Sequence, residues 1–264
     1  MRPLRLFALV LLAFCSTARP SNPALCVLVY NIHAGRDAAG VVNLDRVAQV
    51  IASTNADVVL LQEVDRNTAR SGNADHFAML MRLTKFDGAF GKSLDYQGGQ
   101  YGIAILSRRP ITAHHVIPFR TDPPQMRAGG SFEPRIALVV ETRGPAGPLR
   151  IINTHLDASG EDMYRRQEAE QLALTIPDES PQFAGGDFNS TPDSAVHERM
   201  QSAGVRDAWL ECGSGPELTY PADAPVKRID YLYLSNGWTC TSAKVIETQA
   251  SDHRPVLFTV RNAS

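Results

Sequence analysis

Short runs of apolar and mostly β-branched residues recur along the chain and predict β-strands. Their lengths and residue types are typical of strands inside a sheet rather than of helices. The predicted strands cover residues 25–30, 58–62, 103–106, 136–141, 149–153, 182–185, 229–234 and 256–260.

Between these runs, apolar residues recur at helical spacing and predict four helices. The helices are expected after the N-cap Asn43, over residues 77–84, from a capping-box pattern at 159–162 to Pro177, and between Pro192 and Gly204. Segments 118–130 and 213–225 are rich in loop-forming residues and are expected to shape substrate access. Because strands and helices alternate, the chain is predicted to be an α/β protein.

Length and composition predict one domain. The chain has 264 residues, 44% of them hydrophobic, and no Gly/Ser-rich or Pro-rich linker divides residues 25–262. The formal net charge of −2 and the pI near 6.4 exclude a strongly basic surface. Tight capture of nucleic acid by charge alone is therefore not expected.

Residues 1–18 have the layout of a secretory signal. Arg2 and Arg5 precede an apolar stretch over residues 6–14, and small residues at 16–18 form a cleavage site. We expect cleavage and a secreted or periplasmic protein, with an uncleaved anchor as the alternative. The apolar stretch is too short to span a bilayer comfortably, so no stable membrane span is expected after cleavage.

Export would leave three cysteines in a compartment where disulfides persist. Cys26 opens a predicted strand and is interpreted as a buried small hydrophobe. A Cys212–Cys240 disulfide and a pair of free thiols both remain open, since the sequence does not show how close the two residues come.

Polar residues follow several of the apolar runs, as expected for a site built at strand ends. They are Asn31, Glu63, His155, Asp187, Asn189, Asp230 and the pair Asp252-His253. Four of them are carboxylates, whose mutual repulsion calls for a cation, a shared proton or both. Carboxylate and amide oxygens suit Mg²⁺, or Mn²⁺, better than Zn²⁺, and the sequence has no HExxH or CxxC motif.

Two histidines complete this chemistry. His155 and His253 can orient or activate water, and they can donate hydrogen bonds to a phosphoryl oxygen whose charge grows in the transition state. The combination of a divalent metal, carboxylates and histidines predicts hydrolysis of a phosphate ester.

The ordered motifs resemble the endonuclease/exonuclease/phosphatase superfamily, which includes deoxyribonuclease I. The resemblance covers nearly the whole mature chain and rests on Asn31, Gln62-Glu63, residues 101–107, Asn153-Thr-His155-Leu, Gly186-Asp187-Phe188-Asn189, Arg228-Ile-Asp230-Tyr and Ser251-Asp252-His253. It implies a four-layered α/β sandwich, in which two packed mixed β-sheets are flanked by helices.

The resemblance also implies a role for each matched residue. Glu63 is the expected principal Mg²⁺ ligand, assisted by Asn31 and Asp252. Asp187 is expected to position or deprotonate the attacking water, and Asn189 to bind the phosphoryl group.

The remaining matched residues are expected to contact the substrate. His253, oriented by Asp230, resembles the histidine that contacts the scissile phosphate, and His155 would make a second phosphate contact. Tyr101 and Arg135 are expected substrate-binding residues, although Arg135 could instead pair with Glu133.

Two departures from the family pattern stand out. His33 takes the place of an acidic residue found in some nuclease branches, and it either faces the site or forms a loop hydrogen bond. The Gln100-Tyr101 pair offers His155 no evident carboxylate partner.

These inferences together predict an exported, monomeric, metal-dependent phosphoesterase that cleaves a phosphodiester, with nucleic acid as the leading substrate. A phospholipid phosphodiesterase and a sugar-phosphate or inositol-phosphate phosphatase are the alternative enzymes. The alternative outside enzymes is a binding module that keeps the fold without turnover.

Overall fold

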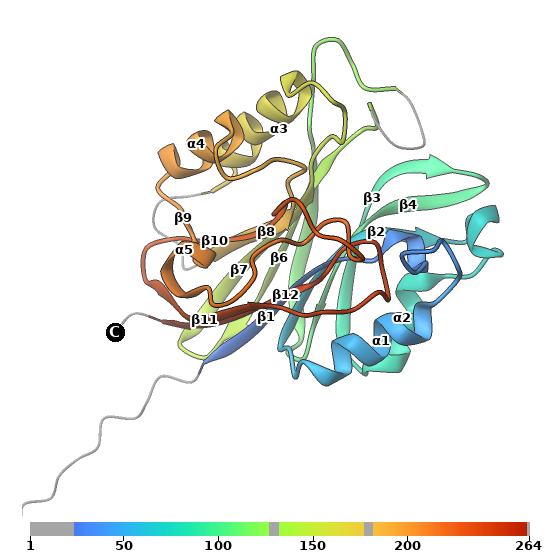
Figure 1. The fold of residues 1–264 in the computed structure, drawn as a ribbon, viewed down its shortest axis with the longest axis horizontal. Coiled ribbons are helices and arrows are strands. Elements are labelled where there is room, and N and C mark those ends of the chain that lie inside the picture. Colours follow the sequence, from blue (N-terminus) through green and yellow to red (C-terminus); the bar gives the residue numbers. More distant parts are fainter. Residues whose placement is uncertain (1–23, 127–131, 177–181, 263–264) are drawn as a thin grey trace, which may run out of the picture.

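The structure, a computed structural model, consists of two six-stranded sheets packed face to face (Figure 1). It describes residues 24–126, 132–176 and 182–262. The predicted signal segment 1–18 and Pro177 lie outside these residues.

The first sheet has the strand order β11-β12-β1-β2-β4-β3. Its members are β1 (Leu25–Asn31), β2 (Val58–Arg66), β3 (Asp87–Tyr96), β4 (Gly99–Ser107), β11 (Trp238–Val245) and β12 (Val256–Asn262).

The second sheet has the order β5-β6-β7-β8-β10-β9. It contains β5 (Ile111–Pro118), β6 (Ile136–Gly144), β7 (Gly147–His155), β8 (Gln182–Asp187), β9 (Arg206–Asp207) and β10 (Asp230–Leu234).

Each sheet is mixed in the same way. A parallel pair occupies the centre, β1 with β2 in one sheet and β7 with β8 in the other, and the flanking pairs are antiparallel. The two strands of a parallel pair end at the same edge of the sheet. Asn31, His155 and Asp187 are the last residues of β1, β7 and β8, so this topology sets where polar side chains gather.

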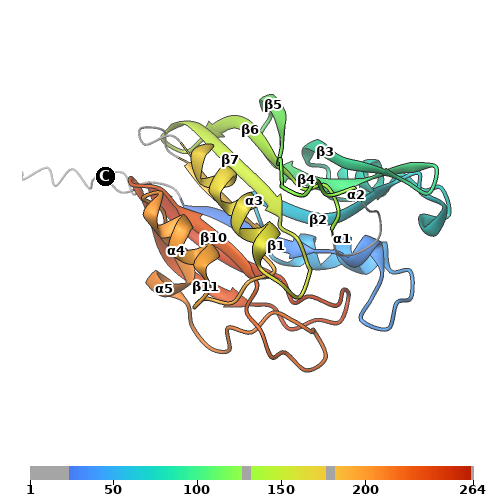
Figure 2. The ribbon, with the colours of Figure 1, turned by 90° about the horizontal axis from the view of Figure 1, so that it is seen from above.

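Helices cover the outer face of each sheet and complete four layers (Figure 2). Helices α1 (Leu44–Ser53) and α2 (His76–Thr84) pack on the first sheet, and α3 (Met163–Leu174) and α4 (Ala195–Ser202) on the second. The short elements are η1 (His33–Gly35), η2 (Ala69–Ser71) and α5 (Ala208–Cys212). The predicted sandwich of two mixed sheets flanked by helices is confirmed.

A central core fills the space between the sheets. Residues such as Val29, Leu60, Ile105, Leu138 and Phe183 are almost completely buried there. Because both faces of the central strands are covered, their sequences are continuous apolar runs, as is typical of such strands.

Some boundary predictions were wrong. Helix α3 begins at Met163, and the hydroxyl of Ser159 donates to the carbonyl oxygen of Glu161 rather than capping the helix. The helix predicted between Pro192 and Gly204 is shorter, because it spans only Ala195–Ser202. The segment predicted as a loop from residue 118 onward starts inside β5.

The structure joins Cys212 and Cys240 in a disulfide that ties α5 to β11, and Cys26 is a free thiol. Of the two alternatives left open by the sequence, the disulfide is the one observed. Among the described residues, no helix has the length and apolar character needed to cross a membrane.

Candidate active site

A cavity of about 470 Å³ lies where the central strands of both sheets end. Eight of the ten predicted site residues line it: Glu63, Tyr101, Arg135, His155, Asp187, Asn189, Asp252 and His253. The other two, Asn31 and Asp230, are fully buried beside the cavity and hydrogen-bond to residues that line it. The fold thus brings together site residues that lie between positions 31 and 253 of the sequence.

Glu63 reaches the cavity because β2 bulges at this point. Leu61 pairs with Ala104 of β4, but the next pair is Val64 with Gly102, so β2 contains one extra residue. A bulge of this kind re-aims a side chain out of the regular pleat. Glu63 itself has a φ of 57°, which is uncommon for a residue other than glycine.

Asn31 links two carboxylates from different sheets. Its amide nitrogen donates to Glu63 Oε1 at 3.1 Å and to Asp187 Oδ2 at 3.0 Å, while its oxygen accepts the backbone N–H of His33 at 3.0 Å. In this arrangement the amide presents nitrogen, not oxygen, to the carboxylates. Its expected role as an oxygen ligand of a metal stays a prediction, whereas its role in spacing Glu63 and Asp187 is visible.

Asp187 lies at the centre of the site. Its Oδ1 accepts the backbone N–H of Asn189 at 2.9 Å, and its Oδ2 lies 3.6 Å from Nε2 of both His155 and His253. Burial raises the pKa of the Asp187 carboxyl, and Asp230 adds to this effect, while His253 opposes it. A carboxyl with a raised pKa at a cavity wall suits a base that takes a proton from water.

His253 is held as a cation by two aspartates. Its Nδ1 donates to Asp230 Oδ2 at 3.0 Å, and its Nε2 faces Asp187. Burial alone would lower the pKa of His253, but the charges of Asp230 and Asp187 outweigh it and raise the pKa. The ring of Tyr220 packs beside the imidazole with centroids 4.8 Å apart. An oriented imidazolium of this kind can donate to a phosphoryl oxygen.

His155 differs from His253 although both face Asp187. Burial and the nearby charges of Arg135 and His253 lower the pKa of His155, so its imidazole is neutral. The Gln100-Tyr101 segment provides no carboxylate here, but Asp187 of the neighbouring strand β8 places its Oδ2 3.6 Å from His155 Nε2. This partner could not be seen in the residues around His155, because it arises from strand pairing.

The oxygen donors at the cavity fit a hard divalent cation. Glu63 and Asp252 both present carboxylates to the cavity, next to the buried Asp187. No cysteine lines the cavity, and this set of donors suits Mg²⁺ or Mn²⁺. Asp252 Oδ1 also lies 3.8 Å from His33 Nδ1, so His33 faces the site as well as contacting its own loop.

A second group of possible ligands, Asp187, Asp230 and His253, has donor atoms within 4.8 Å of one another. The surroundings of His253 argue against metal binding by this group. Both ring nitrogens of His253 face carboxylates, and a protonated imidazole does not coordinate a metal.

The wall expected to contact substrate contains more than Tyr101 and Arg135. Arg135 Nη2 lies 3.3 Å from Glu133 Oε2, so the predicted alternative of pairing with Glu133 is observed, and both residues still line the cavity. Three further polar residues line the cavity and were not named individually by sequence reasoning: Arg70, Lys227 and Tyr220, which lies in the segment 213–225 expected to shape substrate access. Their local sequences carry no motif, and only the fold places them here.

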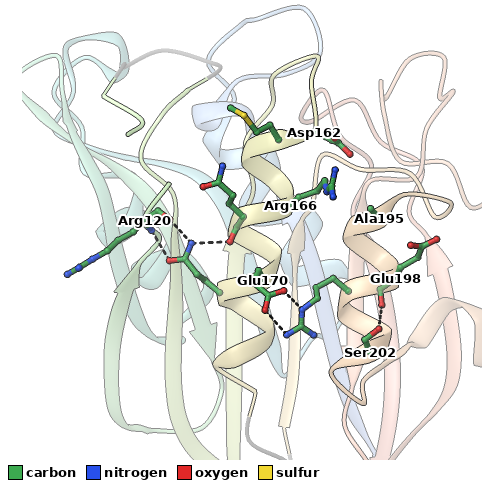
Figure 3. A pocket seen from close by; sticks show the side chains of 11 residues that line it. Arg120, Asp162, Arg166, Glu170, Ala195, Glu198 and Ser202 are labelled. Atoms are coloured by element: carbon green, nitrogen blue, oxygen red, sulfur yellow. Dashed lines mark hydrogen bonds and ion pairs between the residues drawn. The ribbon is translucent and has the colours of Figure 1, made fainter. Parts of the chain in front are cut away.

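A larger cavity of about 770 Å³ lies between α3 and α4 on the outer face of the second sheet (Figure 3). Its charged side chains include the ion pair of Arg199 with Glu170, and it has no histidine or buried carboxylate. It lacks the chemistry gathered at the strand ends, so we place the active site at the smaller cavity.

Comparisons with known proteins identify a family and a fold. Residues 28–253 match the endonuclease/exonuclease/phosphatase family, whose members are hydrolases that act on phosphate esters. The uncharacterised protein YbhP of Escherichia coli K12 is 28% identical over 244 residues, which cover 87% of this chain and 93% of YbhP.

Two further proteins are similar over part or most of the chain. The inositol phosphosphingolipids phospholipase C of Schizosaccharomyces pombe is 26% identical over 181 residues, or 63% of this chain and 41% of that protein. The structure of the mannosyl-6-phosphatase Bt3783 of Bacteroides thetaiotaomicron has a TM-score of 0.72 and 17% identity, covering 89% of this chain and 99% of that one. The fold is shared with the solved structure, and the match over residues 28–253 shows that the chain belongs to the endonuclease/exonuclease/phosphatase family.

Proposed function

We propose that the protein is a divalent-metal-dependent phosphodiesterase, with oligonucleotides as its leading substrates. The observation that carries the proposal is the single cluster in which Asn31 spaces Glu63 and Asp187 beside the cationic His253. Two close carboxylates from different sheets favour a bound cation, and the imidazolium beside them favours an anionic substrate.

The chain's own residues account for the main steps of hydrolysis. Asp187 accepts the proton of the attacking water, since its raised pKa makes it a better base than an ordinary aspartate. His253 donates to a non-bridging phosphoryl oxygen, and Asp230 fixes its ring. His155 and Asn189 line the same cavity and are placed for further phosphate contacts.

Glu63 and Asp252 would hold Mg²⁺ or Mn²⁺, with Asn31 beside them. The metal, when bound, would polarise the phosphoryl group and stabilise the leaving oxygen.

The phosphodiester preference is supported by the similarity to a protein named as an inositol phosphosphingolipids phospholipase C. A monoesterase remains the second candidate, because the mannosyl-6-phosphatase shares the fold over nearly its whole length. The formal net charge of −2 argues against tight binding of a long duplex by charge alone, so short oligonucleotides are the nucleic acids proposed as substrates.

The test is hydrolysis of bis-p-nitrophenyl phosphate and of p-nitrophenyl phosphate by the purified protein with Mg²⁺, Mn²⁺ or EDTA. We expect faster turnover of the diester, loss of turnover with EDTA and recovery with added Mg²⁺. Glu63→Gln should lower kcat/KM by about 10³-fold without unfolding the protein.

Glu198→Gln is the matched control, because Glu198 is exposed and lines the larger cavity between α3 and α4. It should hydrolyse both substrates at the wild-type rate. Turnover that survives in EDTA, or that Glu63→Gln leaves unchanged, would contradict the proposal, and faster turnover of the monoester would make the phosphatase the better candidate.

We also propose that the protein acts outside the cytoplasm. The disulfide between Cys212 and Cys240 supports this location, because such bonds persist in oxidising compartments. N-terminal sequencing of the protein recovered from the expressing cells should find residues 1–18 removed; an intact Met1 would contradict cleavage.

A further inference from the structure

Arg70 is a cleft residue that the proposed reaction does not use. It lies in η2, just after β2, and its side chain lines the cavity next to Tyr101. The groups assigned to the scissile phosphate, by contrast, come mostly from the second sheet and from the segment before β12. Arg70 therefore enters the cavity from the first sheet, opposite in origin to most of the groups proposed to contact the scissile phosphate.

A buried carboxylate holds Arg70 in one orientation. Asp65 is completely buried and accepts two hydrogen bonds, from Arg70 Nε at 2.7 Å and from Nη2 at 2.9 Å. Asp65 also accepts the hydroxyl of the buried Thr68 at 2.8 Å, and in β2 it pairs with Tyr101 of β4. A guanidinium held at both nitrogens loses little further freedom when it binds a ligand.

The backbone and two aromatic rings restrict Arg70 further. Its N–H donates to Gln97 Oε1 at 2.9 Å, and its carbonyl accepts from Arg36 Nη2 at 2.9 Å. Its guanidinium carbon lies 4.8 Å from the ring centre of Tyr96 and 5.2 Å from that of Tyr101. These contacts make a rigid cationic group rather than a mobile surface arginine.

The donor count leaves Arg70 with capacity for a ligand. A guanidinium has five N–H bonds, and Asp65 takes one from Nε and one from Nη2. Among the described residues, the other three have no partner. Because the side chain is 26% exposed and lines the cavity, these donors are accessible to substrate.

We propose that Arg70 forms a second anion subsite, which makes the cleft selective for phosphodiesters that carry another phosphate nearby, as successive nucleotides do. This inference rests on the proposed phosphodiesterase function. A fixed guanidinium fork matches the oxygens of a phosphate, and a substrate with only one phosphate would leave it unused.

The chain contains a matched control for a purely structural role. Arg66 Nη2 donates to Asp75 Oδ2 at 2.7 Å, and its guanidinium carbon lies 5.2 Å from the ring centre of Phe90. Arg66 thus has the same kind of carboxylate and aromatic partners, but it does not line the cavity. If arginines of this kind only stabilise the fold, substitution of the Asp65/Arg70 pair and of the Asp75/Arg66 pair should change ligand affinity to the same extent.

The experiment measures the affinities of thymidine 3′,5′-bisphosphate and thymidine 5′-monophosphate by calorimetry in excess Mg²⁺. Because loss of Arg70 alone would leave the buried Asp65 uncompensated, the main variant is Asp65→Asn with Arg70→Gln, which keeps a neutral hydrogen-bonded pair. The control is Asp75→Asn with Arg66→Gln, and Arg70→Lys tests charge without the fork.

We expect the wild-type protein to bind the bisphosphate about tenfold more tightly than the monophosphate. The Asp65/Arg70 variant should bring this ratio close to one, Arg70→Lys should give an intermediate ratio, and the Asp75/Arg66 variant should keep the wild-type ratio. A wild-type ratio near one, or an equal loss in both double variants, would overturn the subsite.

Hydrolysis of bis-p-nitrophenyl phosphate, measured in parallel, separates the two proposals. No hydrolysis together with an Arg70-dependent ratio would overturn the phosphodiesterase function and retain an anion-binding subsite. Hydrolysis with a ratio that does not depend on Arg70 would overturn the subsite alone.

Discussion

Unusual backbone conformations at single residues shape this site. His33, Glu63 and Asn189 all line the cavity, and their φ values are 49°, 57° and 48°. Each such conformation costs a non-glycine residue on the order of 1–2 kcal/mol. The motifs predicted which side chains gather here, but the backbone angles that aim them come from the surrounding fold and could not be predicted from residue type.

Gly186 shows why the Gly-Gly-Asp motif needs its second glycine. Its φ is 141°, and a Cβ at this position would lie 1.9 Å from the carbonyl oxygen of Thr154 in the paired strand β7. We expect Gly186→Ala to destabilise the protein by at least about 3 kcal/mol more than Gly204→Ala. Gly204 has a φ of 79° but open space around its Cβ. Urea unfolding of both variants checks this, and equal losses would contradict it.

Asp230→Asn tests the positioning of His253. The amide can still accept from His253 Nδ1, but the negative charge that raises the pKa of His253 is lost. We expect kcat to fall about 10²-fold with little change in KM. Because the lower pKa of His253 lets its imidazolium lose the proton at lower pH, the alkaline limb of the pH–rate profile should move to lower pH.

The control for this change is Asp207→Asn, which alters another buried aspartate of the second sheet that pairs with Arg228 and does not line the cavity. A pH–rate profile that moved equally in both variants would show that Asp230 has no special relation to His253.

At the scale of elements, the sequence predicted every interior strand and none of the edge strands. The edges of the two described sheets are β11, β3, β5 and β9. Exposed positions recur along β3, β5 and β11, β3 also contains two glycines, and β9 is only two residues long. Only strands covered on both faces become continuous apolar runs, whereas edge strands carry polar residues that discourage pairing with other chains.

Helix α3 contributes a buried carboxyl, that of Glu168. Glu168 is completely buried, its Oε2 accepts the backbone N–H of Asp157 at 2.8 Å, and burial raises its pKa from 4.5 to about 7. The folded state thus holds a proton that the unfolded state releases above pH 4.5. This contribution to stability is complete below pH 4.5 and is lost as the pH rises through about 7.

Glu168→Gln should remove this pH dependence. Between pH 4 and pH 8 its free energy of unfolding should therefore fall by less than that of wild type, the difference being on the order of 3 kcal/mol. Urea unfolding at the two pH values measures the difference. Glu170→Gln, on the exposed side of the same helix, should not show this smaller fall. The same pH dependence in wild type and Glu168→Gln would show that another group is responsible.

At the scale of the whole molecule, buried polar bonds lock the two sheets together beneath the site. Asn153 of the second sheet donates to the carbonyl oxygens of Leu61 and Ala104 at 2.9 Å each, and it accepts from Gln62 at 2.7 Å. These residues surround the bulge that aims Glu63. The sequence predicted Asn153 as part of a motif, but its partners lie 49 to 92 residues away and only the sandwich reveals them.

Asn153→Leu should cost about 3 kcal/mol, because it leaves several buried groups unsatisfied, and it should also reduce kcat through displacement of Glu63. Thr142→Val is the control, since the buried hydroxyl of Thr142 in β6 makes one bond, to the carbonyl oxygen of Pro110 just before β5, and does not join the two sheets. Stability and turnover are measured for both. A variant of Asn153 that lost stability but kept the wild-type kcat would show that the bulge positions Glu63 without the hydrogen bonds of Asn153.

The position of β12 between β11 and β1 has a consequence during protein synthesis. A nascent chain carries Asn31 and Glu63 long before Asp252 and His253 are added, and the first sheet stays divided until β12 inserts beside β1. An incomplete chain on the ribosome therefore lacks both the imidazolium of His253 and the strand β12 that follows it. The candidate site is therefore complete only after the last strand of the chain is in place.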